Sequence, residues 1–298
     1  MSRKKAEMEG LIIKAVGGLY TVESPDGSML PCRARGIFRR QGISPCAGDR
    51  VRVENECITE IFPRKNQLIR PPLANLDKLI FVLSVRDPAP NLQLLDRFLA
   101  VCVYKSIEPV LVFTKVDLAD SARYAEIYSK TGFPVYDVDY RRPETLRPVY
   151  DELEGAVSAF TGNSGVGKST LLNALDVRLQ LETADISKKL GRGRHTTRET
   201  ALYTLPNGGR VADTPGFSTF ETEAYAQIAP EELAGCFPEL RRTEAPCRYA
   251  DCRHLREPGC AVRAAVEAGE IPQSRYESYT EMLTGSGRQC RPPFRFAP

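Results

Sequence analysis

The chain has 298 residues, of which 42% are hydrophobic and 27% charged, and its formal net charge is +3. This composition is ordinary for a soluble globular protein with two or three domains. No apolar run approaches the roughly 20 residues of a membrane span, and Leu11–Ile13 is too short for a signal-peptide core, so we expect a cytoplasmic protein.

Residues 1–70 have the pattern of a small β-barrel. Turn residues separate four candidate strands, which are Leu11–Val16, Tyr20–Glu23, Met29–Ala34 and Arg50–Glu54. About five strands in this length favour an OB-type barrel, a fold that often binds nucleic acid. The segment holds 13 Lys and Arg against 8 Asp and Glu, including the cluster Arg33, Arg35, Arg39 and Arg40. This positive patch either meets a phosphate backbone or is simply a solvated face.

The pattern changes after a predicted linker, which is bracketed by Pro63 and the pair Pro71-Pro72. Over residues 71–222, strand-like and helix-like segments alternate, which indicates a mostly parallel sheet with helices on both faces. The predicted strands are Leu79–Val85, Val110–Phe113, Val135–Val138 and Ala156–Thr161. The predicted helices are Leu92–Tyr104, Ser121–Thr131, Glu144–Leu153 and Lys168–Leu175. Ligands of such sheets bind at the carboxyl ends of the strands.

A complete Walker A motif follows the strand Ala156–Thr161. It reads Gly162, Asn163, Ser164, Gly165, Val166, Gly167, Lys168, Ser169 and Thr170. The glycines let backbone N–H groups turn toward phosphate oxygens, and the start of the next helix adds a positive dipole. Lys168 is expected to reach the β- and γ-phosphates, and the Ser169 hydroxyl to bind magnesium. The sequence therefore predicts a nucleoside triphosphate site.

The strand Val110–Phe113 is followed by a segment that selects the base. Thr114, Lys115, Val116 and Asp117 resemble the guanine motif Asn-Lys-x-Asp. Asp117 would accept two hydrogen bonds from donors that adenine lacks, while the stem of Lys115 covers one face of the base. Thr114 stands where asparagine is usual, so we expect somewhat lower base affinity. The serine–alanine motif that usually follows the next strand is replaced by Val138-Asp139-Tyr140, and we assign no site residue there.

Two further segments resemble the switch regions of GTPases. An apolar strand ends in Asp213-Thr214-Pro215-Gly216, where Asp213 would hold magnesium through a water and the Gly216 N–H would sense the γ-phosphate. The glycine- and charge-rich stretch from Gly191 to Thr197 fits switch I. Thr197, or alternatively Thr196, would complete the magnesium shell. The order of base motif, P-loop, switch I and switch II is a circular permutation of the usual order.

The water-orienting group differs from that of many GTPases. Phe217 follows Gly216, where a glutamine often orients the attacking water, and a phenylalanine cannot do this. His195, one of only two histidines, is the candidate to act with Thr197 and Lys168 in catalysis. The alternative is an exposed loop histidine. We expect slow hydrolysis unless a partner orders this loop.

Residues 223–298 carry a cluster of metal-binding residues. Cys247, Cys252, His254 and Cys260 lie within 14 residues, and three thiolates with one imidazole make a closed tetrahedral shell for a structural zinc. The other cysteines are scattered, and Cys236 is a spare. Two helices follow, Ala261–Ala268 and Ser274–Leu283. On the second helix, Arg275, Tyr276 and Tyr279 either face RNA or pack against the zinc loop.

Together these features resemble the small ribosomal subunit-dependent GTPase A family (RsgA, also called YjeQ or EngC). The resemblance rests on the basic barrel and on Thr114–Asp117, Gly162–Thr170, Arg194–Thr197, Asp213–Gly216 and Cys247–Cys260. It implies a GTPase that is stimulated by the small ribosomal subunit, binds ribosomal RNA and acts late in subunit assembly. The expected architecture is an OB-type barrel (1–70), a circularly permuted α/β GTPase domain (71–222) and a helical zinc-binding domain (223–298). We expect a monomer that uses GTP or GDP with magnesium and one structural zinc.

Two other functions stay open at the level of sequence. One is a P-loop ATPase with a different client, which Asp117 argues against because adenine offers it no donor pair. The other is an RNA-binding zinc protein in which the nucleotide only stabilises the fold. Turnover with and without small subunits distinguishes this last reading from a ribosome-assembly GTPase.

Overall fold

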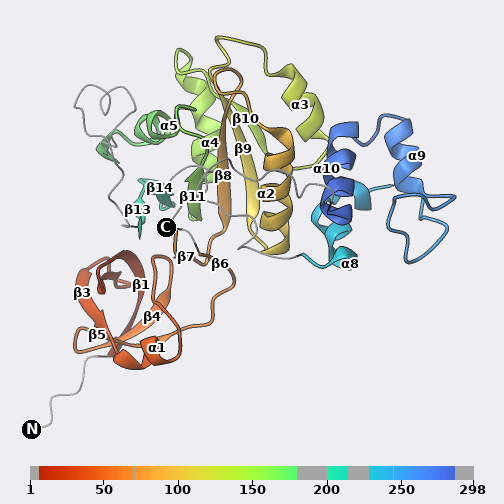
Figure 1. Ribbon diagram of the computed structural model, residues 1–298. Helices are drawn as coiled ribbons and strands as arrows, with labels where there is room; N and C mark the ends of the chain where they lie inside the picture. The colour runs from red at the N-terminus through yellow and green to blue at the C-terminus, as the bar shows by residue number, and fades with distance from the viewer. Residues whose placement is uncertain (1–6, 70, 180–199, 214–227, 244, 286–298) are drawn as a thin grey trace, which may run out of the picture.

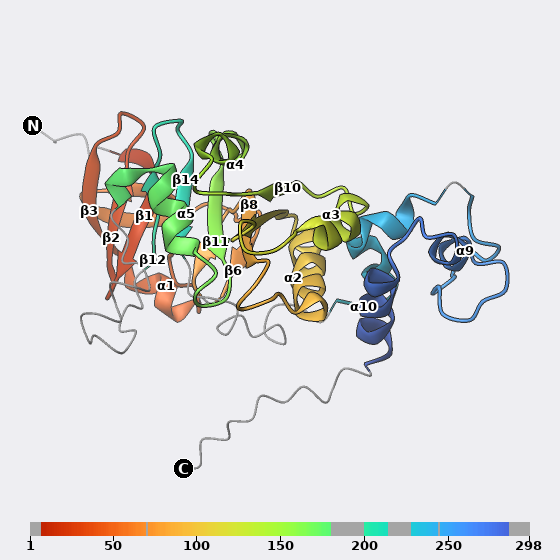
Figure 2. The same ribbon diagram turned by 90° about the horizontal axis from the view of Figure 1, so that it is seen from above.

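The computed structural model describes residues 7–69, 71–179, 200–213, 228–243 and 245–285. Figures 1 and 2 show three bodies in a row, with a β-barrel at one end, an α/β sheet in the middle and a small helical unit at the other end. Within the described ranges, no helix combines the length and apolar character needed to cross a membrane.

The N-terminal body is a closed five-stranded barrel. Its strands are β1 (Glu7–Val16), β2 (Leu19–Glu23), β3 (Met29–Ala34), β4 (Arg50–Glu54) and β5 (Cys57–Ile61). They pair in the order β1-β2-β3-β5-β4, and pairing between β1 and β4 closes the barrel. Alternate side chains fill the interior, including Ile12, Val22, Val51 and Ile58. Helix α1 (Gly36–Arg40) adds the buried Phe38. The predicted OB-type barrel is confirmed, and β5 is a strand that the sequence reading did not assign.

A small hairpin spans the end of the predicted linker, with β6 (Gln67–Leu68) inside the linker and β7 (Leu73–Ala74) directly after Pro71-Pro72. A buried ion pair ties this segment to the barrel: the Arg64 Nε and Nη2 atoms lie 2.6 and 2.7 Å from the two carboxylate oxygens of Asp49. The Asn75 side chain also donates to the Gly48 carbonyl at 2.8 Å. The linker is therefore held against the barrel over part of its length.

The central sheet has the strand order β10-β9-β8-β11-β14-β13. Its strands are β8 (Lys78–Ser84), β9 (Glu108–Thr114), β10 (Val135–Asp137), β11 (Val157–Thr161), β13 (Tyr203–Thr204) and β14 (Arg210–Asp213). All neighbours are parallel except β13 and β14. The predicted mostly parallel sheet is therefore confirmed, with an antiparallel strand at one edge.

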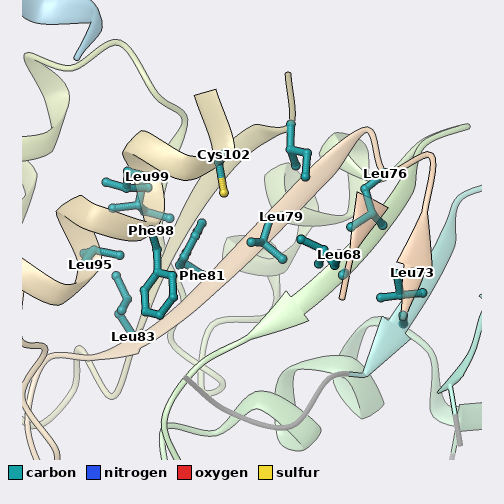
Figure 3. Packing of buried hydrophobic residues seen from close by; sticks show 14 of the residues in the cluster. Leu68, Leu73, Leu76, Leu79, Phe81, Leu83, Leu95, Phe98, Leu99 and Cys102 are labelled. Atoms are coloured by element: carbon teal, nitrogen blue, oxygen red, sulfur yellow. The ribbon is translucent and has the colours of Figure 1, made fainter. Parts of the chain in front are cut away.

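Helices cover both faces of this sheet because its central strand is apolar on both sides. From β8, Leu79, Phe81 and Leu83 pack with α2 (Leu92–Tyr104) and α3 (Ala122–Ser129). Figure 3 shows Phe98 of α2 reaching toward Phe81, with ring centroids 6.5 Å apart. The alternate residues Ile80 and Val82 pack with α4 (Arg147–Glu152) and α5 (Lys168–Leu175) on the other face.

The helix predicted over Glu144–Leu153 begins differently in the structure. A 3-10 turn, η1 (Pro143–Leu146), comes first, and α4 starts only at Arg147. Pro148 has no N–H to donate to Glu144, so a regular α-helical ladder cannot form across this point. A second 3-10 turn, η2 (Val177–Leu179), follows α5.

The C-terminal unit is built from short helices, with α10 packed against the central domain. They are α8 (Pro230–Leu233), η4 (Ala234–Cys236), η5 (Pro238–Arg241), α9 (Ala261–Glu267) and α10 (Gln273–Thr284). Arg275 of α10 is fully buried and lies 2.7 Å from Asp96 of α2 and 2.6 Å from Glu239 of η5. Burial alone lowers the pKa of Arg275, but the charges of Asp96 and Glu239 outweigh it and keep the pKa above its ordinary value.

The barrel is joined to the central domain through a two-stranded contact. Strand β12 (Thr200–Ala201) pairs antiparallel with β1, with Ala201 opposite Lys14 and Thr200 opposite Ala15. The next residue, Leu202, donates its N–H to the Ile13 carbonyl at 2.7 Å. Arg210 of β14 forms a half-buried ion pair with Glu23 of β2 at 2.7 Å. The barrel sheet thus gains an additional strand from the part of the chain that leads into β13 and β14 of the central sheet.

Candidate nucleotide and metal sites

The carboxyl ends of the parallel strands meet at one edge of the sheet and bring the predicted nucleotide motifs together. Ser84, which ends β8, is paired with Thr114, which ends β9. On the other side of β8, Phe160 near the end of β11 is paired with Asp213, which ends β14. The base motif and the P-loop therefore leave the sheet on either side of β8, although they are far apart along the chain.

Two glycines of the P-loop are required by its geometry. Gly162 lies against the end of β8, and a Cβ on it would fall 2.3 Å from the Val82 carbonyl oxygen. Gly167 has φ +92° and directly precedes α5. An L-residue rarely adopts this left-handed conformation, so glycine is needed there. Lys168 and Ser169 then form the first turn of α5, where backbone N–H groups favour an anion.

Thr114 joins the base motif directly to the P-loop. Its side chain is fully buried, and Oγ1 lies 2.6 Å from the Val166 carbonyl oxygen and 3.3 Å from that of Leu83. A hydroxyl has a single proton, so the shorter contact, to Val166, is the one it donates to. The substitution of threonine for asparagine thus keeps a connection to the phosphate loop.

Tyr140 is a second side chain that contacts the P-loop, at the carbonyl of the residue after Val166. The Tyr140 hydroxyl donates to the Gly167 carbonyl oxygen at 3.3 Å. Burial raises the pKa of Tyr140, so the phenol stays protonated and able to donate. The sequence reading assigned no site residue in this segment. An aromatic residue three positions after the end of a parallel strand, at the carboxyl edge, is the signal that marks it.

The other base-motif residues lie at the same edge of the sheet. Lys115 has a left-handed backbone, with φ +59°, and its amino group donates to the Asp87 carbonyl oxygen at 2.6 Å. Val116 is half-buried against the apolar cluster below. The Asp117 side chain is 31% exposed, and its carboxylate lies 3.7 Å from the Arg141 guanidinium. Asp117 is therefore open to a ligand at one side and contacts a cation at the other.

Several predicted residues lie outside the part of the chain that the structure describes. These are His195, Thr196, Thr197, Gly216 and Phe217, so their roles remain predictions. Asp213 is the last residue of β14, which places it at the same strand edge as the P-loop.

The predicted zinc ligands converge in the C-terminal unit. The ligand atoms of Cys247, Cys252, His254 and Cys260 all lie within 4.8 Å of one another. His254 Nδ1 is 3.5 Å from the sulfur of Cys247 and 3.5 Å from that of Cys260, and these two sulfurs are 3.9 Å apart. A tetrahedral zinc with ordinary bond lengths requires separations of about 3.5–3.8 Å. The residues therefore fit zinc, and Cys236 is not part of this group.

Hydrogen bonds around the cluster hold its loop in place. Tyr276 donates to the His254 carbonyl at 2.6 Å, and Tyr279 donates to the Arg253 carbonyl at 2.8 Å. Both tyrosines thus pack against the metal loop, which was one of the two alternatives considered for them. Backbone N–H groups led by that of Arg253 donate to the Glu257 carboxylate and lower its pKa to about 2.

Arg275 follows neither alternative. It lies inside the junction described above, with its guanidinium carbon 4.7 Å from the centre of the Phe237 ring. The Asp96 carboxylate that it contacts also accepts from Ser278 at 2.7 Å and from Tyr128 at 2.9 Å. This side chain therefore connects the metal-binding unit to the central domain.

Comparison with known proteins identifies the same arrangement. A family model described as RsgA GTPase matches residues 61–223, and one described as RsgA N-terminal domain matches residues 9–60. Two proteins named small ribosomal subunit biogenesis GTPase RsgA align with this chain, and in each case the alignment covers 96% of the relative's length. The Bacillus subtilis protein is 43% identical over 93% of this chain, and the Geobacillus kaustophilus protein is 45% identical over 92%.

Solved structures give the same result. The crystal structure of YjeQ from Thermotoga maritima is 33% identical, with a TM-score of 0.78 over 95% of this chain and 100% of that protein. YloQ, described as a circularly permuted GTPase, is 36% identical, with a TM-score of 0.76 over 98% of this chain and 99% of that protein. The predicted fold class is confirmed, and the chain belongs to the RsgA family of circularly permuted GTPases.

Proposed function

We propose that this chain binds the small ribosomal subunit and couples GTP hydrolysis to a late step in the assembly of that subunit. Relatives named small ribosomal subunit biogenesis GTPase RsgA match the chain over more than nine-tenths of its length, which supports this proposal. The structural observation behind the nucleotide part is the hydrogen bond from Thr114 to Val166, which joins a base-reading motif to a phosphate loop. We further propose that the chain works in the cytoplasm as a monomer, with domains at 1–70, 71–222 and 223–298.

Within this proposal, each nucleotide motif has a separate task. Asp117 reads guanine, and the backbone from Gly162 to Thr170 surrounds the phosphates. Ser169 and Thr197 are the residues that would hold magnesium directly, with Asp213 acting through a water. When bound, magnesium offsets charge that develops on the phosphate oxygens. Lys168 adds a positive charge beside the same oxygens.

The water that attacks the γ-phosphate needs an orienting group. Phe217 offers no polar atom, and His195 precedes the candidate switch I threonines by one or two positions. We propose that its imidazole orients the water once a bound subunit orders the loop. A positioned acid–base group typically contributes about 10²–10⁴ in rate.

The barrel supplies a surface for ribosomal RNA. On the barrel, four exposed arginines lie close together on β3 and around α1, namely Arg33, Arg35, Arg39 and Arg40. Such a cluster suits a phosphate backbone, because each cation that contacts a phosphate releases a condensed counterion. Zinc would stabilise the fold of the C-terminal domain without taking part in the chemistry, because all four ligand positions come from the protein.

Turnover measurements test this function against its alternatives. The full chain is incubated with GTP or ATP, with and without small subunits, and phosphate release is followed. We expect hydrolysis of GTP, not ATP, and strong stimulation by the subunit. Equal use of ATP would indicate a general P-loop ATPase. GTP binding without stimulated turnover would indicate an RNA-binding zinc protein with a structural nucleotide.

A substitution tests the base-reading part of the proposal. Asp117→Asn is expected to weaken GTP binding and to favour xanthosine triphosphate, which presents the complementary acceptor. Asp151→Asn is the matched control, because Asp151 is an exposed carboxylate on α4 that pairs only with Arg147 among the described residues. An unchanged GTP affinity in Asp117→Asn would remove Asp117 from the site.

A further inference from the structure

The loop after β10 is built around one buried carboxylate. Asp139 accepts hydrogen bonds from the Arg141 backbone N–H at 3.0 Å, from the Arg141 Nε at 3.2 Å and from the Arg142 Nε at 3.1 Å. Its own N–H donates to the Thr145 hydroxyl at 3.1 Å. These bonds, led by the Arg141 backbone N–H, lower the pKa of Asp139, which is therefore ionised at neutral pH. Hydrogen bonds within the loop itself therefore fix its shape.

This loop contacts both halves of the nucleotide site. Tyr140 donates to the Gly167 carbonyl of the P-loop, and the next residue, Arg141, places its Nη2 atom 3.7 Å from the Asp117 Oδ2 atom. Arg142 also pairs with Asp139, but its described ion pairs do not include Asp117. Arg141 therefore connects the loop to the residue that selects the base.

The charges at this point explain why an arginine is needed. Asp139 and Asp117 are both carboxylates, and Arg141 contacts both of them. Two neighbouring carboxylates repel one another, which would favour turning the more exposed Asp117 side chain away from its neighbour. A guanidinium is planar, is always charged and has several donors, so it can satisfy two carboxylates at once.

We infer that Arg141 is a positioning residue for Asp117, and that the segment Asp139-Tyr140-Arg141 replaces the serine–alanine motif missing from this chain. Asp139 fixes the conformation of the loop after β10, and Tyr140 hydrogen-bonds to the phosphate loop. Arg141 holds the Asp117 carboxylate toward the guanine ring. This inference rests on the proposed function, because it takes a guanine nucleotide as the ligand.

Binding of guanosine diphosphate to the full chain tests the inference. Because the Arg141 side chain is 68% exposed, its ion pair is partly screened, and we expect Arg141→Met to weaken binding about fivefold. Arg142→Met is the matched control, since it removes a neighbouring partner of Asp139 and should change affinity less than about twofold. Arg141→Lys keeps the charge and should recover part of the loss. Thermal unfolding of each variant checks that the fold is intact.

A double-mutant cycle separates positioning from a merely structural role. In the Asp117→Asn background, with xanthosine diphosphate as ligand, the carboxylate that Arg141 orients is gone, so Arg141→Met should have little further effect. Equal weakening by Arg141→Met and Arg142→Met, or a loss that persists in Asp117→Asn, would overturn the inference. If the unsubstituted chain shows no preference for guanosine over adenosine diphosphate, the proposed function fails instead.

Discussion

The metal cluster and the nucleotide site are assembled from very different stretches of chain. All four candidate zinc ligands come from one 14-residue segment, and their loop is held by α10 close by. The nucleotide site gathers the ends of β9, β10 and β11, and the bond from Thr114 to Val166 spans 52 residues. The first site is therefore local and would depend on a bound ion, while the second is held by the sheet. The two should fail independently and to different degrees.

Loss of the metal should have the largest effect. Cys252→Ser is expected to release zinc and unfold much of the region 245–285, since zinc contributes about 10–16 kcal/mol to the folding of small zinc domains. Nucleotide affinity should change less than about twofold, because the sheet does not depend on this ion. Metal analysis measures the zinc content, hydrogen exchange measures the unfolding of region 245–285, and titration with nucleotide measures the affinity.

The control is Cys236→Ser, which replaces a buried cysteine outside the cluster and should keep its zinc. A native protein with far less than one zinc per chain would contradict this prediction.

The junction between the two regions gives the next largest effect. Arg275→Met leaves Asp96 and Glu239 buried without their cation, which costs about 3–5 kcal/mol. The free energy of unfolding, measured in urea, should fall by that amount. Gln93→Ala is the control at the same junction, because its bond to Glu281 is exposed and should contribute under about 1 kcal/mol. If both variants lost a similar free energy of unfolding, the buried charges would not be the main source of stability at the junction.

A smaller change should affect only the nucleotide site. Thr114→Ala removes the hydrogen bond to Val166, worth about 1 kcal/mol, and should weaken nucleotide binding roughly fivefold. Zinc content should not change. Thr114→Ser keeps the hydroxyl and should restore most of the affinity, as measured by titration calorimetry. If serine and alanine have the same effect, packing of the methyl group matters more than the bond.

The ion pair between the barrel and β14 should have the smallest effect. Glu23→Gln leaves a hydrogen-bonding side chain opposite Arg210 but removes the charge, so we expect a loss of about 0.5–1 kcal/mol at low salt. The loss should shrink at 1 M salt, where the Debye length is about 3 Å. Unfolding curves at both salt concentrations measure it, and a loss that is independent of salt would argue against an electrostatic origin.

Local signals in the sequence predicted the parts that depend on local structure. The helices Leu92–Tyr104 and Lys168–Leu175 were predicted with their observed limits, because apolar spacing and the P-loop glycines mark them. The Cys and His residues of the candidate zinc site were predicted to converge because their residue types are rare and lie close together in the sequence, and in the structure their ligand atoms do converge. The structure brings together the base motif and the P-loop as the topology of a parallel sheet implies.

Long-range contacts account for what the sequence did not reveal. The ion pair of Arg275 with Asp96 joins residues 179 positions apart, and neither residue stands in a motif. The contact of Arg141 with Asp117 depends on the path of a loop whose shape is fixed by Asp139. Strand β5 was not assigned because the turn before it, at Asn55 and Glu56, contains neither glycine nor proline to separate it from β4.

The pairing of β12 with β1 gives the barrel and the central domain a connection made by backbone hydrogen bonds. Strand β12 begins three residues after Thr197 and is followed at once by β13, which pairs with β14 at the edge of the sheet. Because Thr200 and Ala201 are paired in antiparallel register with Ala15 and Lys14, the backbone hydrogen bonds fix the direction in which β12 runs along the barrel. The stretch from residue 200 to residue 204 is therefore held by two sheets at once, by the barrel through β12 and by the central sheet through β13.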